Sequence, residues 1–274
     1  SIFTNLTPEH LDFHGTMESY FAAKASLFTS TFTSVGVVNY DDVYGRLIAD
    51  TNEIQCVPFS VHDVQNISAT ASSHEFSWKT HHVKVNVGGK FNISNSLAAV
   101  TAAVQLGVSE TDIVVGLAAA ETVPGRFEQV RSSTGFDVVI DYAHTPDALQ
   151  RVLLAAREVV GTKQQVVVVF GCGGDRDSEK RPLMGAIAAK FADCVVVTSD
   201  NPRSESPATI TQNIIDGVGA LNANTIIATE IDRRLAIQFA LKSARSGDIV
   251  VIAGKGHEKT QTIGNDVLPF DDVA

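Results

Sequence analysis

The sequence predicts an α/β protein whose second half forms a mostly parallel sheet with helices on its faces. Five largely apolar, mostly β-branched runs each stop at a polar or glycine-rich loop, and they are 136–140, 166–170, 194–197, 226–228 and 249–253. Strands covered on both faces have no polar side, so such runs need not alternate. Helix-length amphipathic segments separate the runs, as where Leu149, Val152, Leu153, Ala156 and Val160 share one helical face. Strands that alternate with helices are typical of a parallel sheet.

The loops that follow these runs predict where a ligand binds. They are 141–146, 171–177, 198–203, 230–233 and 254–258. Parallel sheets bind ligands beyond the carboxyl ends of their strands, and all five loops follow such ends. Arg176 and Arg203 suit carboxylates, because guanidinium pairs with them in bidentate geometry, and Glu258 suits an ammonium group. This set fits an amino acid with two carboxylates and an amine, and surface arginines without a ligand are the alternative.

Two further features of these loops have simpler explanations than chemistry. A nucleophilic Cys172 would need a base beside it, which the sequence does not specify, and a small residue in a tight turn explains it equally well. The segment from Gly254 to Thr260 resembles a phosphate-binding P-loop, but Glu258 stands where that motif has glycine and would repel phosphate. The sequence contains no G-x-x-x-x-G-K-[ST] motif.

Length and composition bound the class of protein. A chain of 274 residues, 44% of them hydrophobic, can bury two ordinary cores, and we expect two domains, 1–124 and 125–274, that meet at Pro124-Gly125. The formal net charge of −10 argues against nucleic acid as a partner. No apolar run has the length of a membrane span, and three cysteines fit a reducing cytoplasm. We expect a cytoplasmic monomer that binds small molecules, not a membrane.

The first half of the chain contains a lysine in an unusual position. Thr16 is predicted to cap a helix whose apolar face includes Tyr20 and Phe28, and Lys24 lies on that face at steps of four from both. One interpretation is a lysine whose stem follows the apolar stripe while its ammonium reaches water. The other is a desolvated lysine, whose neutral amine could do chemistry or accept carbon dioxide. The preceding loop, 5–15, is either a source of metal ligands or a solvated polar loop.

The remaining elements of the first half are less regular. A strand is expected at Val35–Asn39, followed by short β-type pieces between residues 54 and 87. A helix is expected from about residue 93, with Asn92 as its N-cap and Gly107 as its stop. A further helix should begin at Ser109 and end near Pro124.

Taken together, these stretches resemble the Mur ligase family, and most closely its meso-diaminopimelate-adding members. The matching segments, which occur in family order, are 5–15, 22–24, 92–95, 125–128, 141–147, 171–176, 180–182, 200–203 and 254–258. Each segment is modest alone, and the set is highly specific. The resemblance implies the later part of a P-loop-type central ATPase domain, followed by a Rossmann-like C-terminal domain that binds the amino acid.

The family joins an amino acid to a nucleotide-sugar peptide through an acyl phosphate made with ATP. By resemblance, Lys24 matches a catalytic lysine that becomes a carbamate and holds Mg²⁺, and His10 matches a second magnesium ligand. Cations suit this chemistry, because phosphoryl transfer to a carboxylate gathers negative charge. Four residues match positions around ATP: Asn95 near adenine, Asp141 at the ribose, and Arg126 and His144 nearer the phosphates.

The resemblance also supplies the other substrates, UDP-N-acetylmuramoyl-L-alanyl-D-glutamate and meso-diaminopimelate. Segment 200–203 has the form that goes with meso-diaminopimelate, where arginine can bind the distal carboxylate. The implied pocket consists of Arg176, Asp200, Asn201, Arg203, Gly254 and Glu258. An arginine left unpaired against the ammonium of lysine would reject lysine.

Two other functions are consistent with parts of the sequence. A ligase like folylpolyglutamate synthetase shares the fold and the lysine, and segment 200–203 argues against it. A noncatalytic amino-acid-binding module could retain only the C-terminal pocket. Family members carry a uridine-nucleotide domain and a P-loop ahead of the segments matched here, so we expect this chain to be part of such an enzyme and inactive alone. ATP-dependent ligation by the isolated chain would overturn that expectation.

Overall fold

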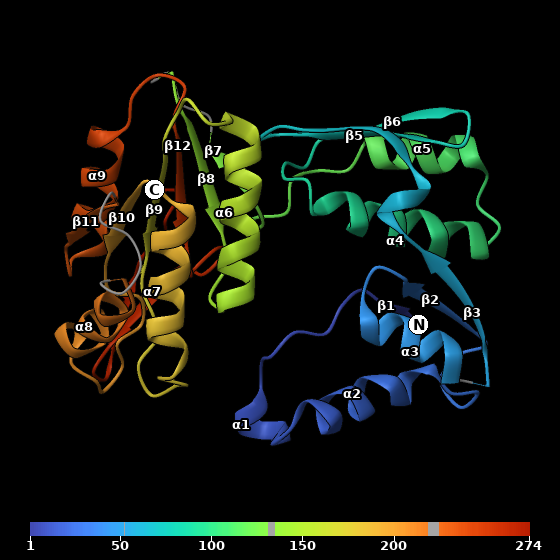
Figure 1. Cartoon of the computed structure of the whole chain (residues 1–274), viewed down its shortest axis with the longest axis horizontal. Helices are drawn as coiled ribbons and strands as arrows, with labels where there is room; N and C mark the ends of the chain where they lie inside the picture. Colours follow the sequence, from blue (N-terminus) through green and yellow to red (C-terminus); the bar gives the residue numbers. More distant parts are fainter. Residues whose placement is uncertain (52, 131–134, 219–224) are drawn as a thin grey trace. The chain divides into compact units, whose positions relative to one another are not determined.

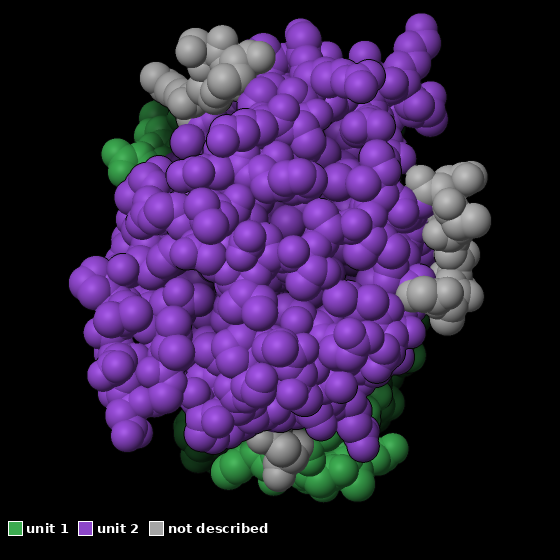
Figure 2. All heavy atoms as spheres, turned by 90° about the vertical axis from the view of Figure 1, so that its left-hand side faces the viewer, with its two compact units in different colours: residues 1–86, 90–121 green, residues 87–89, 122–274 purple. Residues whose placement is uncertain are grey.

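The computed structural model describes residues 1–51, 53–130, 135–218 and 225–274. The chain forms two compact units, which Figure 2 colours separately. The first consists of residues 1–86 and 90–121, and the second of residues 87–89 and 122–274. The domain boundary predicted at Pro124-Gly125, and the roles assigned on its two sides, stay predictions. Within the described residues, no helix combines the length and apolar character that crossing a membrane requires.

The first unit begins with a small parallel sheet in the order β1-β2-β3. Its strands are β1 (Ile2–Phe3), β2 (Val35–Asn39) and β3 (Gln55–Phe59), so the strand predicted at 35–39 is confirmed. Between β1 and β2 lie α1 (Leu11–His14), α2 (Met17–Ala25) and the 3₁₀ turn η1 (Ser26–Phe28), and α3 (Val43–Thr51) follows β2. Phe3, Leu6, Phe28, Val38 and Ile48 form the core, against which one face of α2 packs.

An antiparallel sheet and two helices complete the first unit. The sheet has the order β4-β5-β6, with β4 (Gln65–Ala69), β5 (His74–Trp78) and β6 (His81–Val85), and the turn η2 (Val61–Asp63) precedes it. Helix α4 (Asn92–Gln105) packs on β2 and β3, while α5 (Glu110–Ala118) packs on β6.

Two predicted helix ends in this unit are wrong. Asn92 is the first residue of α4, and Phe91 occupies the N-cap position without a side-chain cap. Helix α5 begins after its predicted cap, Ser109, but ends at Ala118 instead of continuing toward Pro124.

The second unit is built on the predicted parallel sheet, with one antiparallel edge strand. The strand order is β11-β10-β9-β12-β8-β7, and among these described strands only β7 (Glu128–Val130) runs antiparallel to its neighbour. The parallel strands are β8 (Asp137–Asp141), β9 (Val166–Phe170), β10 (Cys194–Val197), β11 (Ile226–Thr229) and β12 (Ile249–Ala253). The α/β fold class is therefore confirmed. Every residue of β9, β10 and β12 is buried, as expected of strands covered on both faces.

Helices cover both faces of this sheet (Figure 1). Helix α9 (Arg233–Ser243) covers one face, where Ala236, Ile237 and Ala240 meet alternate residues of β8, β9, β10 and β12. Helices α6 (Pro146–Val160), α7 (Lys180–Phe191) and α8 (Pro207–Val218) pack side by side in sequence order on the other face. Thr145 caps α6, and its side-chain oxygen accepts a hydrogen bond from the amide of Ala148.

The strand order reverses at β12, and this reversal positions the candidate site. The chain steps outward from β9 through β10 to β11, and then returns through α9 to insert β12 between β9 and β8. Loops on either side of such a reversal diverge and leave room for a ligand at the carboxyl ends of the strands. After β12 the chain forms a hairpin of β13 (Thr260–Ile263) and β14 (Asp266–Pro269).

Candidate functional site

The loop after β9 lies backbone to backbone against the loop after β10. A Cβ atom on Gly171 would come within 2.3 Å of the Thr198 carbonyl oxygen, and one on Gly174 within 1.9 Å of the Pro202 oxygen. Neither position has room for a side chain, which explains glycine at both. The amide of Gly174 also donates to the carbonyl of Asn201 at 2.9 Å. The two loops are thus joined along one edge of the sheet.

Arg176 and Arg203 both lie beside Gly173. A Cβ atom on Gly173 would be 3.0 Å from Nη1 of Arg203 and 3.9 Å from Cγ of Arg176. Nη1 of Arg203 donates to the Gly174 carbonyl at 2.6 Å, while Arg176 is exposed. Arg203 adopts a left-handed backbone, with a φ of 51°. Two arginines from neighbouring loops therefore reach the same short glycine segment.

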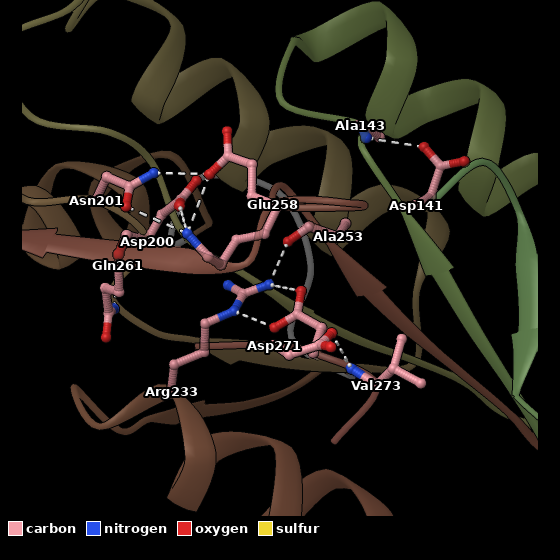
Figure 3. Close-up of polar contacts among 12 residues, drawn as sticks. Asp141, Ala143, Asp200, Asn201, Arg233, Ala253, Glu258, Gln261, Asp271 and Val273 are labelled. Atoms are coloured by element: carbon pink, nitrogen blue, oxygen red, sulfur yellow. Dashed lines mark hydrogen bonds and ion pairs between the residues drawn. The ribbon is translucent and has the colours of Figure 1, made fainter. Parts of the chain in front are cut away.

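A buried lysine joins the loop after β10 to the loop after β12. Lys255 is fully buried, and its Nζ lies 3.3 Å from Oδ1 of Asp200, 3.2 Å from Oδ1 of Asn201 and 3.1 Å from Oε2 of Glu258. Nδ2 of Asn201 also donates to Oε2 of Glu258 at 3.0 Å. Figure 3 shows the side chains of Asp200, Asn201 and Glu258 turned toward one another. The Cα of Gly254 packs near them, since a Cβ there would be 3.3 Å from Oδ2 of Asp200.

The β13–β14 hairpin fastens the loop after β10 from its other side. Nε2 of Gln261 donates to the carbonyl of Asp200 at 2.6 Å, and the amide of Thr262 donates to Oδ1 of Asn201 at 2.9 Å. The backbone amide of Arg203 donates to the Thr262 carbonyl, and the Arg203 carbonyl accepts a hydrogen bond from the amide of Gly264. The backbone around Asn201 and Arg203 is consequently held by strand-like hydrogen bonds.

Two buried arginines lie behind these loops. Arg181 forms a bidentate pair with Glu205, at 2.9 and 2.8 Å, and also donates to the carbonyl of Gly173 at 3.3 Å. These hydrogen bonds from Arg181 keep the pKa of Glu205 below its ordinary value. Arg233 forms a bidentate pair with Asp272, at 2.8 and 2.7 Å, and donates to the carbonyl of Ala253, the last residue of β12. Figure 3 shows Arg233 reaching toward Ala253.

Asp141, at the end of β8, accepts hydrogen bonds from two backbone amides of neighbouring loops. One carboxylate oxygen accepts the amide of Phe127 and the other accepts the amide of Ala143, each at 2.8 Å. Burial raises the pKa of Asp141, and the two amide hydrogen bonds oppose that rise. A ribose contact, as the resemblance implies, would have to leave these two bonds in place.

The other candidate nucleotide residues of this unit surround an aromatic ring. The guanidinium carbon of Arg126 lies 4.8 Å from the centroid of the Tyr142 ring. The rings of His144 and His257 lie 4.6 and 5.3 Å from that ring. Nδ1 of His144 lies 3.0 Å from the Tyr142 carbonyl oxygen, which orients the imidazole. The structure therefore brings Arg126 and His144 together around Tyr142, a residue that the sequence analysis did not single out.

In the first unit, Lys24 and His10 both lie beside Tyr20. Nζ of Lys24 lies 5.2 Å from the Tyr20 ring centroid and donates to the carbonyl of Asn5 at 3.4 Å. The His10 ring lies 6.1 Å from that of Tyr20, and its side chain is 61% exposed. Lys24 is only half-buried. In the described part of the chain, no group of three or more His, Cys, Asp or Glu side chains could hold a metal ion.

Asn95 and Cys172 each contact a neighbour within their own unit. Asn95 is exposed near the start of α4, and its Nδ2 donates to Oδ1 of Asn92 at 2.8 Å. Asn95 belongs to the first unit, whereas Arg126, Asp141 and His144 belong to the second. Cys172 is buried against Met184, and burial raises the pKa of its thiol to about 12. Such a thiol is not a nucleophile near neutral pH, which agrees with its interpretation as a small turn residue.

Comparison with known proteins identifies the family. Residues 1–103 match the model of the Mur ligase middle domain, and residues 125–256 match the model of the Mur ligase glutamate ligase domain. The chain belongs to the Mur ligase family. A curated Mur ligase from Alkaliphilus oremlandii, named UDP-N-acetylmuramoyl-L-alanyl-D-glutamate--2,6-diaminopimelate ligase, is 42% identical over 285 residues, which is 99% of this chain and 57% of that protein.

Solved structures agree with this membership in the Mur ligase family. A solved structure of a ligase with the same name is 36% identical and has a TM-score of 0.62. The match covers 99% of this chain and 58% of that chain. The chain thus spans somewhat over half the length of the Mur ligases that it matches. FolC from E. coli, solved with ADP and without folate substrate, has a TM-score of 0.66 at 22% identity, over 93% of this chain and 59% of its own. That likeness shows a shared fold and does not favour the folate-type alternative.

Sequence reasoning missed several residues whose side chains contact and position the loops at the carboxyl ends of the strands. Lys255, Gln261, Tyr142, Arg233 and Asp272 were not predicted as site residues. For Lys255 a signal was present, because a lysine between two glycines directly after a buried strand must lie at the ligand edge of the sheet. The pair of Arg233 with Asp272 left no local signal, since the two residues are 39 positions apart.

Proposed function

We propose that the chain is part of an ATP-dependent ligase that adds meso-diaminopimelate to UDP-N-acetylmuramoyl-L-alanyl-D-glutamate in peptidoglycan precursor synthesis. The observation that carries the proposal is the arrangement of Arg203, Asn201 and Glu258 on loops joined at the carboxyl ends of β10 and β12. The name of the 42% identical relative from Alkaliphilus oremlandii contains UDP-N-acetylmuramoyl-L-alanyl-D-glutamate and 2,6-diaminopimelate, which supports the choice of both substrates.

The chemistry of these side chains fits the far end of meso-diaminopimelate. Its distal carbon carries a carboxylate, for which Arg203 and Arg176 offer guanidinium groups, and an ammonium, for which Glu258 offers a carboxylate. Lysine carries only an ammonium at that end. Lysine would leave Arg203 without its partner and place a second cation near it, so the pocket should discriminate against lysine.

The same proposal includes ATP and Mg²⁺. ATP supplies the phosphoryl group that activates the carboxylate of the nucleotide-sugar peptide, and we assign Asn95, Arg126, Asp141 and His144 to its binding. A carbamate on Lys24 would offer oxygen atoms, the donors that Mg²⁺ prefers, and the His10 ring also lies beside Tyr20. The remaining magnesium ligands would be water and phosphate oxygens, as is usual for this ion.

Isothermal titration calorimetry of the chain with meso-diaminopimelate and L-lysine tests the amino-acid assignment. We expect binding of meso-diaminopimelate and at least about tenfold weaker binding of lysine, corresponding to one lost charge-assisted contact. The variant R203A should lower the affinity for meso-diaminopimelate by roughly ten- to a hundredfold. The control R151A removes an exposed arginine on α6 that pairs with Asp147, and it should leave the affinity unchanged. Equal affinity for both amino acids, or equal effects of the two variants, would refute the assignment.

A further inference from the structure

We propose that Lys255 is a positioning residue of the amino-acid pocket, which fixes Asn201 and Glu258 so that one Glu258 oxygen is presented to the second amine of the ligand. This inference rests on the proposed function. It concerns a residue that would not itself touch the ligand.

The environment of Lys255 shows that its ammonium is fully engaged. Its side chain is 0% exposed, and an isolated buried ammonium would be strongly unfavourable. An ammonium has three donors, and three oxygens surround it, one each from Asp200, Asn201 and Glu258. With its donors used, Lys255 has no capacity left for a ligand carboxylate. Its effect on a ligand must act through the groups it holds.

The first of these groups is the amide of Asn201. Its Oδ1 accepts from Nζ of Lys255 at 3.2 Å and from the amide of Thr262 at 2.9 Å. Both of these partners are donors only, so the oxygen must face them and the nitrogen must face the other way. Nδ2 consequently points at Glu258 and donates to its Oε2. Lys255 and the amide of Thr262 together set which end of the Asn201 side chain meets the carboxylate.

The second group is the carboxylate of Glu258. Its Oε2 accepts from both Lys255 and Asn201, while its Oε1 accepts no hydrogen bond from any residue in the described ranges. The side chain is 34% exposed, in contrast to the buried lysine. Two donors on one oxygen leave the other as the acceptor for a ligand ammonium. Without these two donors, the Glu258 side chain would rotate among several conformers. Binding would then have to order it, and the entropy lost in that ordering would lower the affinity for the ligand.

Lys255 also separates two like charges. Asp200 and Glu258 both contact its Nζ, and Asp200 is buried. Without the ammonium, Glu258 would be repelled by the Asp200 carboxylate and would turn toward solvent. The charge of Arg233 also attracts both carboxylates, but its Nε and Nη2 atoms bond to Asp272 and the Ala253 carbonyl, and within the described ranges it donates no hydrogen bond to Asp200 or Glu258 that could replace those of the lysine.

Calorimetry with two ligands separates positioning from general damage. The ligands are meso-diaminopimelate and L-2-aminopimelate, which keeps both carboxylates and lacks the second amine. In the variant K255M we expect the affinity for meso-diaminopimelate to fall about tenfold or more, because an oriented charge-assisted hydrogen bond is lost. The affinity for 2-aminopimelate should change less than about threefold. The matched control is K259M, an exposed lysine in the same stretch that pairs with Asp271, and it should change neither affinity.

A second pair of variants covers the case in which K255M does not fold. D200N removes the carboxylate that K255M would leave buried and unpaired, so D200N/K255M should fold, and it is compared with D200N alone. Relative to D200N, we expect D200N/K255M to lose affinity for meso-diaminopimelate and to keep its affinity for 2-aminopimelate. An equal loss for both ligands, or no loss for either, would overturn the inference while binding by the wild-type chain still supports the proposed function. If the wild-type chain does not bind meso-diaminopimelate, both are overturned.

Discussion

At the scale of single residues, the second unit uses buried cations to hold its loops. Arg181, Arg233 and Lys255 are each at most 2% exposed, and each faces at least one carboxylate. Burying such a group is unfavourable unless it is paired and hydrogen-bonded, so each cation fixes the partners that compensate it. For Arg233 the partner is Asp272, and the carbonyl of Ala253 completes the contact.

Removing Arg233 should therefore be costly. R233M leaves the carboxylate of Asp272 buried without a cation, and we expect the free energy of unfolding to fall by about 3–5 kcal/mol. Urea unfolding followed by far-UV circular dichroism measures this change. R151M, which removes a cation from an exposed pair on α6, should cost less than about 1 kcal/mol. A cost for R233M as small as that for R151M would contradict the role given to the buried pair.

At the same scale, prediction from sequence succeeded where the strand ends determine position. Arg176, Arg203 and Glu258 each lie in the loop that follows a predicted parallel strand, and the structure places all three loops at one edge of the sheet. Their role in binding stays a prediction. The burial and the partners of Lys255 and Asp272 were missed because they are properties of the folded chain, although the two flanking glycines could have placed Lys255 at the edge of the sheet. Charged residues are expected at the surface, and a sequence does not show which of them the tertiary contacts will pair and bury.

At the scale of elements, buried strands were predictable because their signal is local. The strands at 166–170, 194–197 and 249–253 have the predicted bounds, since each is a continuous apolar run cut off by glycine or a polar residue. Helix ends were less predictable. Nothing in Ala119 or Ala120 stops a helix locally, and α5 ends where the side chain of Asn86 donates to the Ala118 carbonyl at 3.1 Å. That cap comes from 32 residues away.

The contact between the loops after β9 and β10 gives a test at this scale. G174A adds a Cβ that would lie 1.9 Å from the Pro202 oxygen, so the two loops must separate, and we expect a loss of about 1–3 kcal/mol in the free energy of unfolding. The control G116A adds the same atom inside α5, where it meets nothing within 4 Å. It should be neutral or stabilise by up to about 1 kcal/mol, because alanine favours helix. Equal effects of the two substitutions would argue against the loop packing.

At the scale of the whole molecule, the residues of the proposed amino-acid pocket all belong to the second unit. Arg176, Asp200, Asn201, Arg203, Gly254 and Glu258 all belong to residues 122–274, whereas His10, Lys24 and Asn95 belong to the first unit. Chains with two compact units can unfold in more than one step, and a ligand stabilises the folded state that binds it. The single tryptophan, Trp78, lies in the first unit and reports on that unit alone.

Thermal unfolding followed by two probes can test which unit binds the ligand, because Trp78 lies in the first unit and the proposed pocket residues lie in the second. Saturating meso-diaminopimelate, at about 100 times its Kd, should stabilise the second unit by about 2.7 kcal/mol and raise its melting temperature by several degrees. Circular dichroism should record this shift, while Trp78 fluorescence should melt at an unchanged temperature. A shift seen by fluorescence alone would place the ligand in the wrong unit.

The most direct test of the central claim is a crystal structure of the chain grown with meso-diaminopimelate. We predict that the distal carboxylate lies within hydrogen-bond distance of the Arg203 guanidinium and the distal ammonium within hydrogen-bond distance of Oε1 of Glu258, with Lys255 still on Oε2. A ligand bound elsewhere, or one that contacts neither Arg203 nor Glu258, would contradict the account.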